Sequence, residues 1–482
     1  MNRKNLLFKI NFLVFIFSLF MLIIVISCGG GGGGGGGILP PIGGGSGDST
    51  GTPNISFNNQ GYLIIETKSD SLNTNSLSFN FQTVSPNILA NQNSEPLRNI
   101  NNNIREYKCG FKPSNKNQFN QNIYYSTNPP SVDAMKSFTV IDDNTNTTVT
   151  VNAKCVYVNN NLKYAIWVDI NNADNYDEEA LFNANQSNII SHFNNDYNTL
   201  TTNIDSLNFY VDILITEKID SNSDPSVIGY FWGAQDLQRV NVHPFTFSLN
   251  YGTYNEFNVT LAHEFVHLLE YNKTKIGNHE AWIAEGLATY GEALCGYFGN
   301  VRINSIISFF NNPKTTPLVT NNPDFANYGK SFLFIKQLDQ RFTNAWSNMV
   351  ISDLDGINLI ENINGQEDFQ TTVDKFNIAV LIDTNDNNPT YDFRGINLNS
   401  STFNNGVYRY NGWNNTTLNR MGAAGNMSEW SAYYLYKNSA FNGNILVNGI
   451  QLLFNDFDFI SNSWSMKYND FNNNVRFIVV YR

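Results

Sequence analysis

The sequence predicts an α+β protein, with a central region of mixed helices and strands between two regions of short strands. Residues 55–160 show short apolar alternations broken by Asn, Ser and Pro clusters, a pattern typical of an all-β domain. Residues 161–395 begin with a strand, a long helical period, two more strands and a further helix, which is an α+β order. Residues 396–482 return to short strands. Since 482 residues exceed what one hydrophobic core normally serves, we expect more than one domain.

The two flanking regions are predicted from the period-2 alternation of their apolar residues. In the amino-terminal β domain the strand patterns are Tyr62–Thr67, Leu77–Thr83, Ile104–Phe111, Phe138–Ile141, Thr147–Val151 and Lys154–Val158. The carboxy-terminal domain is expected to be β-sandwich-like. Its strand patterns are Gly406–Tyr410, Ser431–Tyr436, Ile445–Phe454, Trp464–Tyr468 and Val475–Tyr481.

The central region begins with a strand at Tyr164–Asp169, a helix from Glu178 to about Thr199 and a strand at Phe209–Thr216. Val227–Gly233 is either an ordinary strand of the sheet or its edge strand, where an extended peptide could pair. A capping box of the S/T-x-x-E form, Thr253 to Glu256, predicts a helix from there through Glu270. Further helices are expected at His279–Tyr297, Val301–Phe310, Gly329–Arg341 and Phe369–Ile382.

The chemistry of the chain is indicated by the stretch LAHEFVHLLE. Only 5 histidines occur in the chain, yet His263 and His267 stand four positions apart, with Glu264 between them. On a helix with 3.6 residues per turn the two imidazoles share one face and can hold one metal ion. Zn²⁺ most often accepts such a pair, and Glu264 would then lie beside the attacking water. The sequence therefore predicts one catalytic Zn²⁺.

A catalytic zinc needs a third protein ligand and an open fourth position. The stretch WIAEGLA on the next predicted helix supplies Glu285, with 17 residues between it and His267. Glu280 is the competing ligand, but it falls in the first helical turn, where an acid suits the helix dipole. His279 is either a ligand or an exposed loop residue, and the exposed residue is the favoured expectation. His192 and His243 are expected to be surface or satisfied core residues.

The combination of HEFVH with W-x-x-E-G-L-A resembles the gluzincin zinc metallopeptidases, and within them the hyicolysin family of secreted bacterial enzymes. The resemblance covers roughly residues 164–398 and implies a zincin-like catalytic domain. It implies that His263, His267 and Glu285 hold the zinc and that Glu264 is the catalytic base.

The same resemblance suggests a second donor to the tetrahedral oxyanion. In gluzincin aminopeptidases a tyrosine before a lysine-glycine pair at a helix start has this role, and NYGKS is similar but not identical. Tyr328 is therefore the candidate, the alternative being a structural aromatic beneath the cleft. Those aminopeptidases hold the free amine with a G-x-M-E-N stretch, which is absent here. An endopeptidase is thus the better interpretation.

The amino terminus predicts export and lipidation. Arg3, Lys4 and Lys9 precede an apolar run that ends at Cys28, where the sequence resembles a bacterial lipobox. We expect residues 1–28 to be a signal peptide with Cys28 lipidated, the alternative being an uncleaved signal anchor. The Gly-rich residues 29–54 would be a tether of about 25–30 Å to the membrane. The expected location is the bacterial cell envelope, facing the periplasm or the cell exterior.

The remaining cysteines, Cys109, Cys155 and Cys295, would lie in an oxidising compartment. Cys109 and Cys155 fall in adjacent strand patterns, so they are predicted to form a disulfide. The alternative is three buried free thiols.

The charge composition argues against nucleic acid as a partner. The net charge is −12 and only 15% of residues are charged, which leaves no basic patch for nucleic acid. We expect a monomeric, surface-anchored metalloendopeptidase that cuts extracellular proteins or peptides. The rival function is an adhesin or binding lipoprotein with an inactive peptidase scaffold. A third possibility is that the amino-terminal β region is removed as a propeptide.

Overall fold

The structure is a computed structural model. It describes residues 55–57, 61–68, 78–83, 108–109, 125–170, 175–222, 225–249, 255–365, 367–383, 388–398, 411–412, 419–420, 427–437, 441–447, 450–452, 456–459, 465–472 and 475–481. The predicted signal peptide, Cys28 and the tether lie outside these residues. Within the described part of the chain, no helix combines the length and apolar character needed to cross a membrane.

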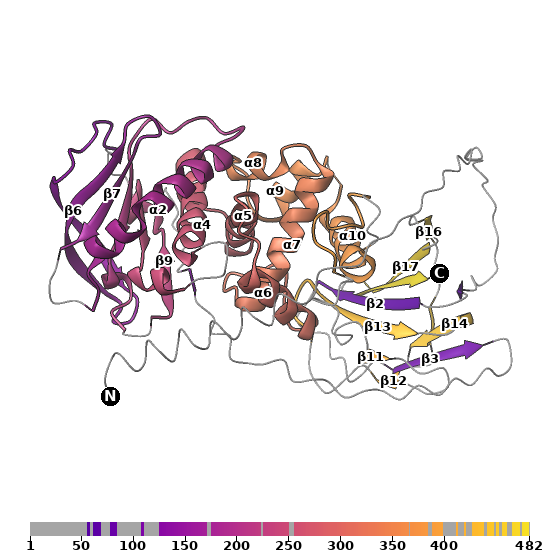
Figure 1. Ribbon diagram of the computed structural model, residues 1–482. Coiled ribbons are helices and arrows are strands. Elements are labelled where there is room, and N and C mark those ends of the chain that lie inside the picture. The colour runs from indigo at the N-terminus through magenta and orange to yellow at the C-terminus, as the bar shows by residue number, and fades with distance from the viewer. Residues whose placement is uncertain are drawn as a thin grey trace, which may run out of the picture. The chain divides into compact units, whose positions relative to one another are not determined.

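A seven-stranded mixed sheet, in the order β4-β9-β10-β8-β7-β6-β5, supports the helices of the central region (Figure 1). Strands β7, β8 and β10 are parallel, and β9 is antiparallel to β10. Both β7 and β8 are buried along their whole length, as expected for parallel strands covered on two faces. The strands are β4 Lys108–Cys109, β5 Met135–Asp142, β6 Thr147–Asn159, β7 Tyr164–Asp169, β8 Val211–Ile215, β9 Val227–Tyr230 and β10 Arg239–Val242.

The prediction of a separate β domain at 55–160 is wrong. β5 and β6 extend the central sheet, whereas β2 (Gly61–Thr67) pairs with strands from the carboxy-terminal end. The reason is local: β6 runs for 13 residues without a break and turns directly into β7, so the two pair antiparallel. The alternation in the sequence correctly marked strands, but it carried no information about their partners.

Of the two alternatives for Val227–Gly233, the structure has the ordinary strand: β4 pairs with β9 on its outer side, so β9 is not the edge strand. The predicted disulfide between Cys109 and Cys155 is absent, because Cys155 is a free, buried thiol. Four strands separate β4 from β6, and neighbouring strands lie about 4.8 Å apart, too far in total for one S–S bond.

Helices α2 and α4 pack beside this sheet (Figure 1). α2 (Glu178–Leu200) starts at Asp177, whose side chain accepts a hydrogen bond from the Ala180 amide at 2.9 Å. α4 (Glu256–Lys273) starts at Asn255, whose side chain accepts from the Phe257 amide at 2.8 Å. The helix predicted from Thr253 is therefore confirmed, but its first turn is capped by Asn255.

A layer of helices continues from α4 through α5 and α7, which pack in succession. These helices follow the predicted ranges closely, except that the short α8 and α9 were not predicted. The helices are α5 Ala281–Leu294, α6 Asn300–Asn311, α7 Phe325–Arg341, α8 Ala345–Val350, α9 Gly356–Ile363 and α10 Phe369–Ile382.

Strands near the carboxyl end form a six-stranded sheet, β11-β13-β2-β18-β17-β16, and a five-stranded sheet built on β1-β14-β3-β12. Apolar residues of both sheets share one core, in which Ile445 of β14 belongs to the same cluster as Leu63 and Ile65 of β2. The predicted strand Gly406–Tyr410 lies outside the described residues. The carboxy-terminal strands are β11 Asn411–Gly412, β12 Asn419–Arg420, β13 Ser431–Lys437, β14 Phe441–Val447, β15 Ile450–Gln451, β16 Asp456–Phe459, β17 Ser465–Asn472 and β18 Val475–Tyr481, which join β1 Ile55–Phe57, β2 and β3 Ser78–Thr83.

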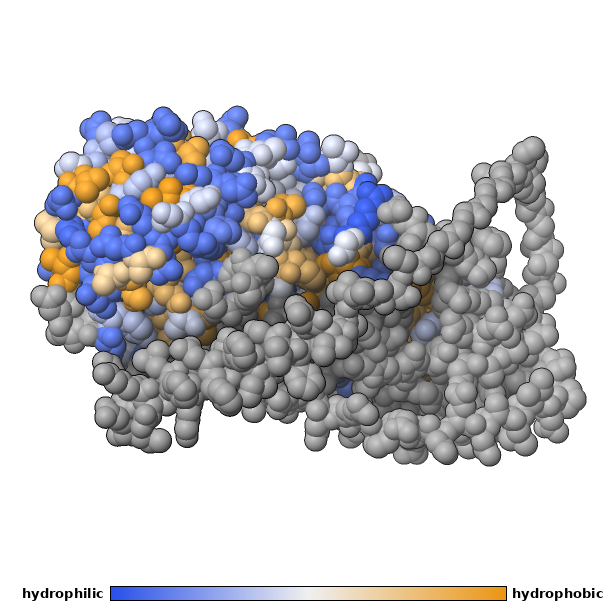
Figure 2. Space-filling model, in the orientation of Figure 1, coloured by the Kyte–Doolittle hydropathy of each residue, from blue (hydrophilic) through white to orange (hydrophobic). Residues whose placement is uncertain are grey.

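Hydrophilic and hydrophobic residues are interspersed on the visible described surface (Figure 2). The most exposed large hydrophobic side chains among the described residues are Met135 at 57% and Val132 at 54%. Met135 lies in β5 and Val132 just before it. β5 is the edge strand at one end of the sheet, whereas β9 and β10, which contact α4, lie toward the other end.

Candidate metal centre

Helix α4 places two histidines on one face, as its sequence predicts. Every residue from Glu256 to Tyr271 is buried, because the helix lies between the sheet and α5. His263 and His267 are 0% and 1% exposed. Polar groups buried this completely require partners, so the side chains that face them define the site.

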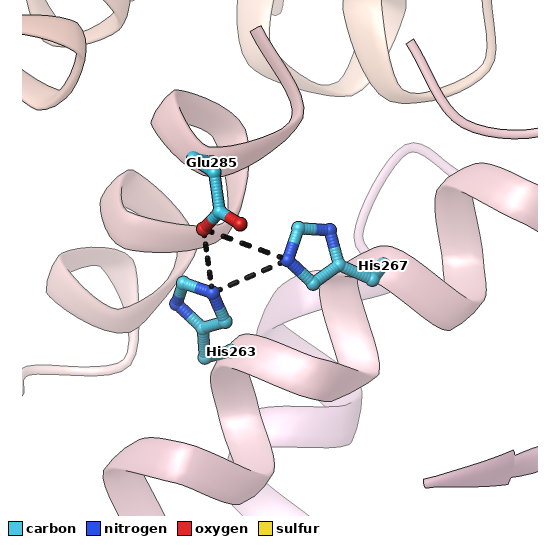
Figure 3. Close-up of side chains that lie close together, drawn as sticks. All are labelled: His263, His267 and Glu285. Carbon is cyan, nitrogen blue, oxygen red and sulfur yellow. Dashed lines mark hydrogen bonds and ion pairs between the residues drawn. The ribbon is translucent and has the colours of Figure 1, made fainter. Parts of the chain in front are cut away.

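The third member of the site is Glu285 on α5, and the three side chains point toward one another (Figure 3). The Nε2 atom of His263 is 3.1 Å from Oε2 of Glu285 and 3.2 Å from Nε2 of His267. The Nε2 atom of His267 is 3.8 Å from the same Glu285 oxygen. Among the described residues these three form the one cluster with the spacing of a metal site.

The donor set fits zinc. A tetrahedral ion with ligand bonds near 2.0–2.1 Å holds its ligand atoms about 3.3 Å apart, close to the three separations found here. Two imidazole nitrogens and one carboxylate oxygen are ligands that zinc accepts. The second Glu285 oxygen, Oε1, is buried and has no hydrogen-bond partner among the described residues. A cation would satisfy this carboxylate, which is otherwise expensive to bury.

The electrostatics of the cluster also favour a cation. Burial alone would lower the pKa of His267, but Glu270 and Glu285 outweigh it and raise that pKa to about 10. Burial would likewise raise the pKa of Glu285, but the two histidines lower it to about 2. The pKa of His263 is raised as well, by Glu285 and Glu292 against the effect of burial. The raised pKa values of the two histidines indicate that the neighbouring carboxylates create a negative potential at the imidazoles, which attracts a divalent ion as it attracts protons.

Glu264 lies one residue from the first ligand and is 1% exposed. Its charge contributes to the raised pKa of His267. Strand β9 comes very close here, since a Cβ atom on Gly229 would lie 3.3 Å from Cγ of Glu264. The absence of a side chain at Gly229 thus allows the sheet to approach the predicted base.

A second layer of carboxylates holds the histidines, and the sequence did not reveal it. Oε1 of Glu292 lies 2.6 Å from Nδ1 of His263, and Glu270 lies 3.8 Å from Nδ1 of His267. Such outer partners orient a ligand imidazole and fix which nitrogen faces the metal. Glu292 lies seven residues after Glu285, two turns along the same face of α5, and this spacing was the available signal.

Tyr328 lies beside the first ligand, at the start of α7. Its ring is stacked on the His263 ring with centroids 6.4 Å apart and planes 29° apart. The guanidinium of Arg302 lies 5.9 Å from the centre of the Tyr328 ring. The half-buried Tyr328 therefore borders the predicted metal site.

The other predicted candidates lie elsewhere. Glu280, the competing ligand, accepts a hydrogen bond from the Trp282 indole at 2.7 Å and is not in the cluster. His279 is 1% exposed, so the prediction of an exposed loop residue is wrong; its Nε2 lies 2.9 Å from the Met349 carbonyl. His243 is a satisfied core residue as predicted, with burial lowering its pKa to about 4. His192 is half-buried and contacts the Tyr297 hydroxyl at 3.1 Å.

No family model matches the chain, and no curated protein matches it. Among solved structures it is similar to an M1 zinc metallopeptidase from Deinococcus radiodurans, with 10% identity and a TM-score of 0.25. The match covers 50% of this chain and 47% of that one, so the chain spans under half of its neighbour. A likeness this weak carries no argument about fold or activity. The functional conclusion depends on the geometry of the site.

Proposed function

We propose that the chain is a zinc-dependent metalloendopeptidase of the gluzincin type, anchored to the bacterial cell envelope and acting on extracellular proteins or peptides. The observation that carries this proposal is the convergence of His263, His267 and Glu285 at separations of 3.1–3.8 Å. With Glu264 beside them, these residues make up the complete set that the sequence motif requires. The resemblance to the hyicolysin family and the lipid anchor at Cys28 are part of the proposal.

Zinc, when bound, supplies Lewis-acid polarisation of the scissile carbonyl and lowers the pKa of the attacking water. The remaining chemistry belongs to this chain. The Glu264 carboxylate takes a proton from the water and passes it to the amine that leaves. Its burial strengthens this role, because bulk water competes little for the proton. The Tyr328 hydroxyl is proposed to donate a hydrogen bond to the oxyanion.

The test uses the chain without residues 1–28, a form that lacks the predicted signal peptide and the lipidated Cys28. Zinc bound per chain is measured together with hydrolysis of a casein substrate, for the parent protein and for Glu264→Gln. Stoichiometric zinc in both, with turnover reduced at least about 100-fold in the variant, is expected because a general base contributes roughly 10²–10⁴-fold. Stoichiometric zinc without turnover on any peptide library would favour the rival function, a binding lipoprotein with an inactive scaffold.

The role of Tyr328 is tested separately with Tyr328→Phe, which removes only the hydroxyl. Turnover should fall tenfold or more while the zinc content stays the same. Unchanged turnover would leave Tyr328 as a structural aromatic residue.

A further inference from the structure

Next to the metal site, a closed ring of side-chain contacts joins four helices, α4, α5, α6 and α7. His263 on α4 uses Nε2 toward Glu285 and Nδ1 toward Glu292 on α5. Glu292 is completely buried and is held by Arg302 of α6. The Nε atom of Arg302 donates to Oε2 of Glu292 at 2.6 Å, and its terminal nitrogen donates to Oε1.

The same guanidinium has a second contact, with Tyr328. Its carbon lies 5.9 Å from the centre of the Tyr328 ring, within the range of a cation–π contact. Tyr328 in turn stacks on His263. Arg302 therefore touches both the carboxylate that orients the ligand imidazole and the aromatic ring that borders the reaction centre.

The backbone accounts for this proximity. A Cβ atom on Gly329 would lie 2.4 Å from the backbone of Ser305, so α6 and α7 meet without a side chain between them. Gly329 follows Tyr328 directly, and Ser305 lies one turn after Arg302. The close crossing of the two helices thus brings Arg302 beside Tyr328.

The side-chain type matters as well. The planar guanidinium offers a fork of donors to one carboxylate while its face lies on an aromatic ring, and a lysine ammonium cannot match that fork. Arg302 has an exposed side-chain fraction of 11%, so these contacts are little weakened by solvent.

We infer that Arg302 is a positioning residue that sets the metal ligand His263, through Glu292, and the Tyr328 phenol together. The inference rests on the proposed function and adds a residue to the same site. The orientation of both His263 and Tyr328 then depends on a residue of α6, a helix that supplies no predicted ligand.

The experiment is a double-mutant cycle of Arg302→Met and Tyr328→Phe in the chain without residues 1–28. Two readouts are taken: kcat and KM for a casein peptide, and the half-time for loss of zinc to excess EDTA. Because Arg302 acts through Glu292, Arg302→Met should shorten zinc retention by about tenfold, the lower end of the roughly 10–100-fold effect of removing an outer-shell partner. It should lower kcat about tenfold or more, with KM changed less than about twofold.

The decisive comparison is between the double variant and the single variants. If Arg302 acts by placing Tyr328, adding Tyr328→Phe to Arg302→Met should cost little further kcat, because the two effects share one cause. Effects that multiply in the double variant, or unchanged zinc retention in Arg302→Met, would overturn the inference.

Arg341→Met is the matched control. Arg341 also pairs with a partly buried carboxylate, Glu367, but at the other end of α7 and away from the ligands. It should leave zinc retention unchanged, and an equal loss in both arginine variants would show a merely structural effect. Should Arg302→Met not fold, Arg302→Lys keeps the charge and enters the same cycle, where intermediate losses are expected and parent values would refute the inference.

The zinc readout separates this inference from the proposed function. A chain that binds zinc and cuts no peptide defeats the proposed function. The zinc-release comparison between the Arg302 and Arg341 variants still decides whether Arg302 positions His263.

Discussion

Replacing Gly229 with alanine tests how closely β9 packs on the helix that carries Glu264. The added Cβ atom would lie 2.3 Å from Cγ2 of Thr260, where ordinary contact begins at 3.4 Å, so it is at least 1.1 Å too close. Thr260 is 1% exposed and has little room to move. Overpacking of this kind costs about 1–3 kcal/mol of unfolding free energy.

The functional effect follows from the neighbouring contact. The same Cβ would lie 3.3 Å from Cγ of Glu264, so relief of the clash by moving α4 also moves the proposed base. A displacement near 1 Å can cost about 100-fold in turnover. Gly229→Ala should therefore lower both the unfolding free energy, measured in urea, and kcat for casein hydrolysis, while zinc remains bound.

A second substitution tests the stated cause. Thr260→Ser removes Cγ2, the atom in the closest contact, and keeps the hydroxyl, so by itself it should cost about 1 kcal/mol for a lost buried methyl group. In the double variant the two losses should not add, with a favourable coupling of about 0.5–3 kcal/mol. Gly229→Ala with parent stability would show that β9 and α4 are further apart than the structure has them. Strict additivity would place the clash elsewhere.

Three further predictions concern the ligand set, the helix crossing and pH. Glu285→Gln should weaken zinc binding, measured by competition with a chelator, by more than the roughly 10–100-fold that an outer-shell loss costs. Glu280→Gln should leave zinc binding unchanged, and the reverse result would exchange the two glutamates. Gly329→Ala should destabilise more than Gly229→Ala in urea, since its Cβ meets backbone of Ser305 at 2.4 Å and no side chain can move aside; equal or smaller loss would contradict the close crossing of α6 and α7. Burial raises the pKa of Asp196 to about 7 from 3.8, so the folded state holds a proton that the unfolded state releases between these values. The stability that this group contributes is therefore lost as pH rises toward 7. Asp196→Asn should show a smaller fall in Tm between pH 5 and pH 8 than the parent, and an identical fall would exclude Asp196 as the cause.

The convergence of the three candidate ligands could be predicted from the sequence because their geometry is local. His263 and His267 are four residues apart on one helix, and Glu285 is on the next helix after a short connection. An i, i+4 pair fixes its own spacing once the helix forms, and packing of consecutive helices leaves few alternatives for the third ligand. Chain proximity therefore determined most of the site.

The supporting groups could not be predicted in the same way. Arg302 lies beside Tyr328 because α6 crosses α7 closely at Gly329, and nothing in the local pattern of α6 indicates that crossing. His279 was expected to be exposed because it follows a loop, yet α8 covers it through the Met349 carbonyl. Each of these contacts depends on packing between helices whose approach is set by side-chain size.

Strand pairing shows most clearly what the sequence pattern does not predict. β2 pairs with β18, the last strand of the chain, although apolar alternation in GYLIIET only identifies a strand. Glu66 is the residue that indicates which elements pack together. It is an acidic residue with 2% exposure in a strand that is otherwise mostly apolar and is buried along its whole length. It accepts hydrogen bonds from Gln370 at 3.0 Å and Asn377 at 2.8 Å, both polar residues on the buried face of α10.

An ionisable residue within an apolar strand therefore requires a polar counterpart on the element that covers it, because a buried carboxyl group without hydrogen-bond partners is costly. Glu66 and Asn377 are each an exception in an apolar stretch, and together they satisfy one requirement. The pKa of Glu66 is raised well above its ordinary value, by burial first and by Asp374 next, so the neutral form is favoured in this contact. Polar residues such as Glu66 and Asn377, which interrupt the apolar pattern, therefore indicate which elements pack together. Pairing one such residue with another requires the distances between elements, which only the folded structure provides.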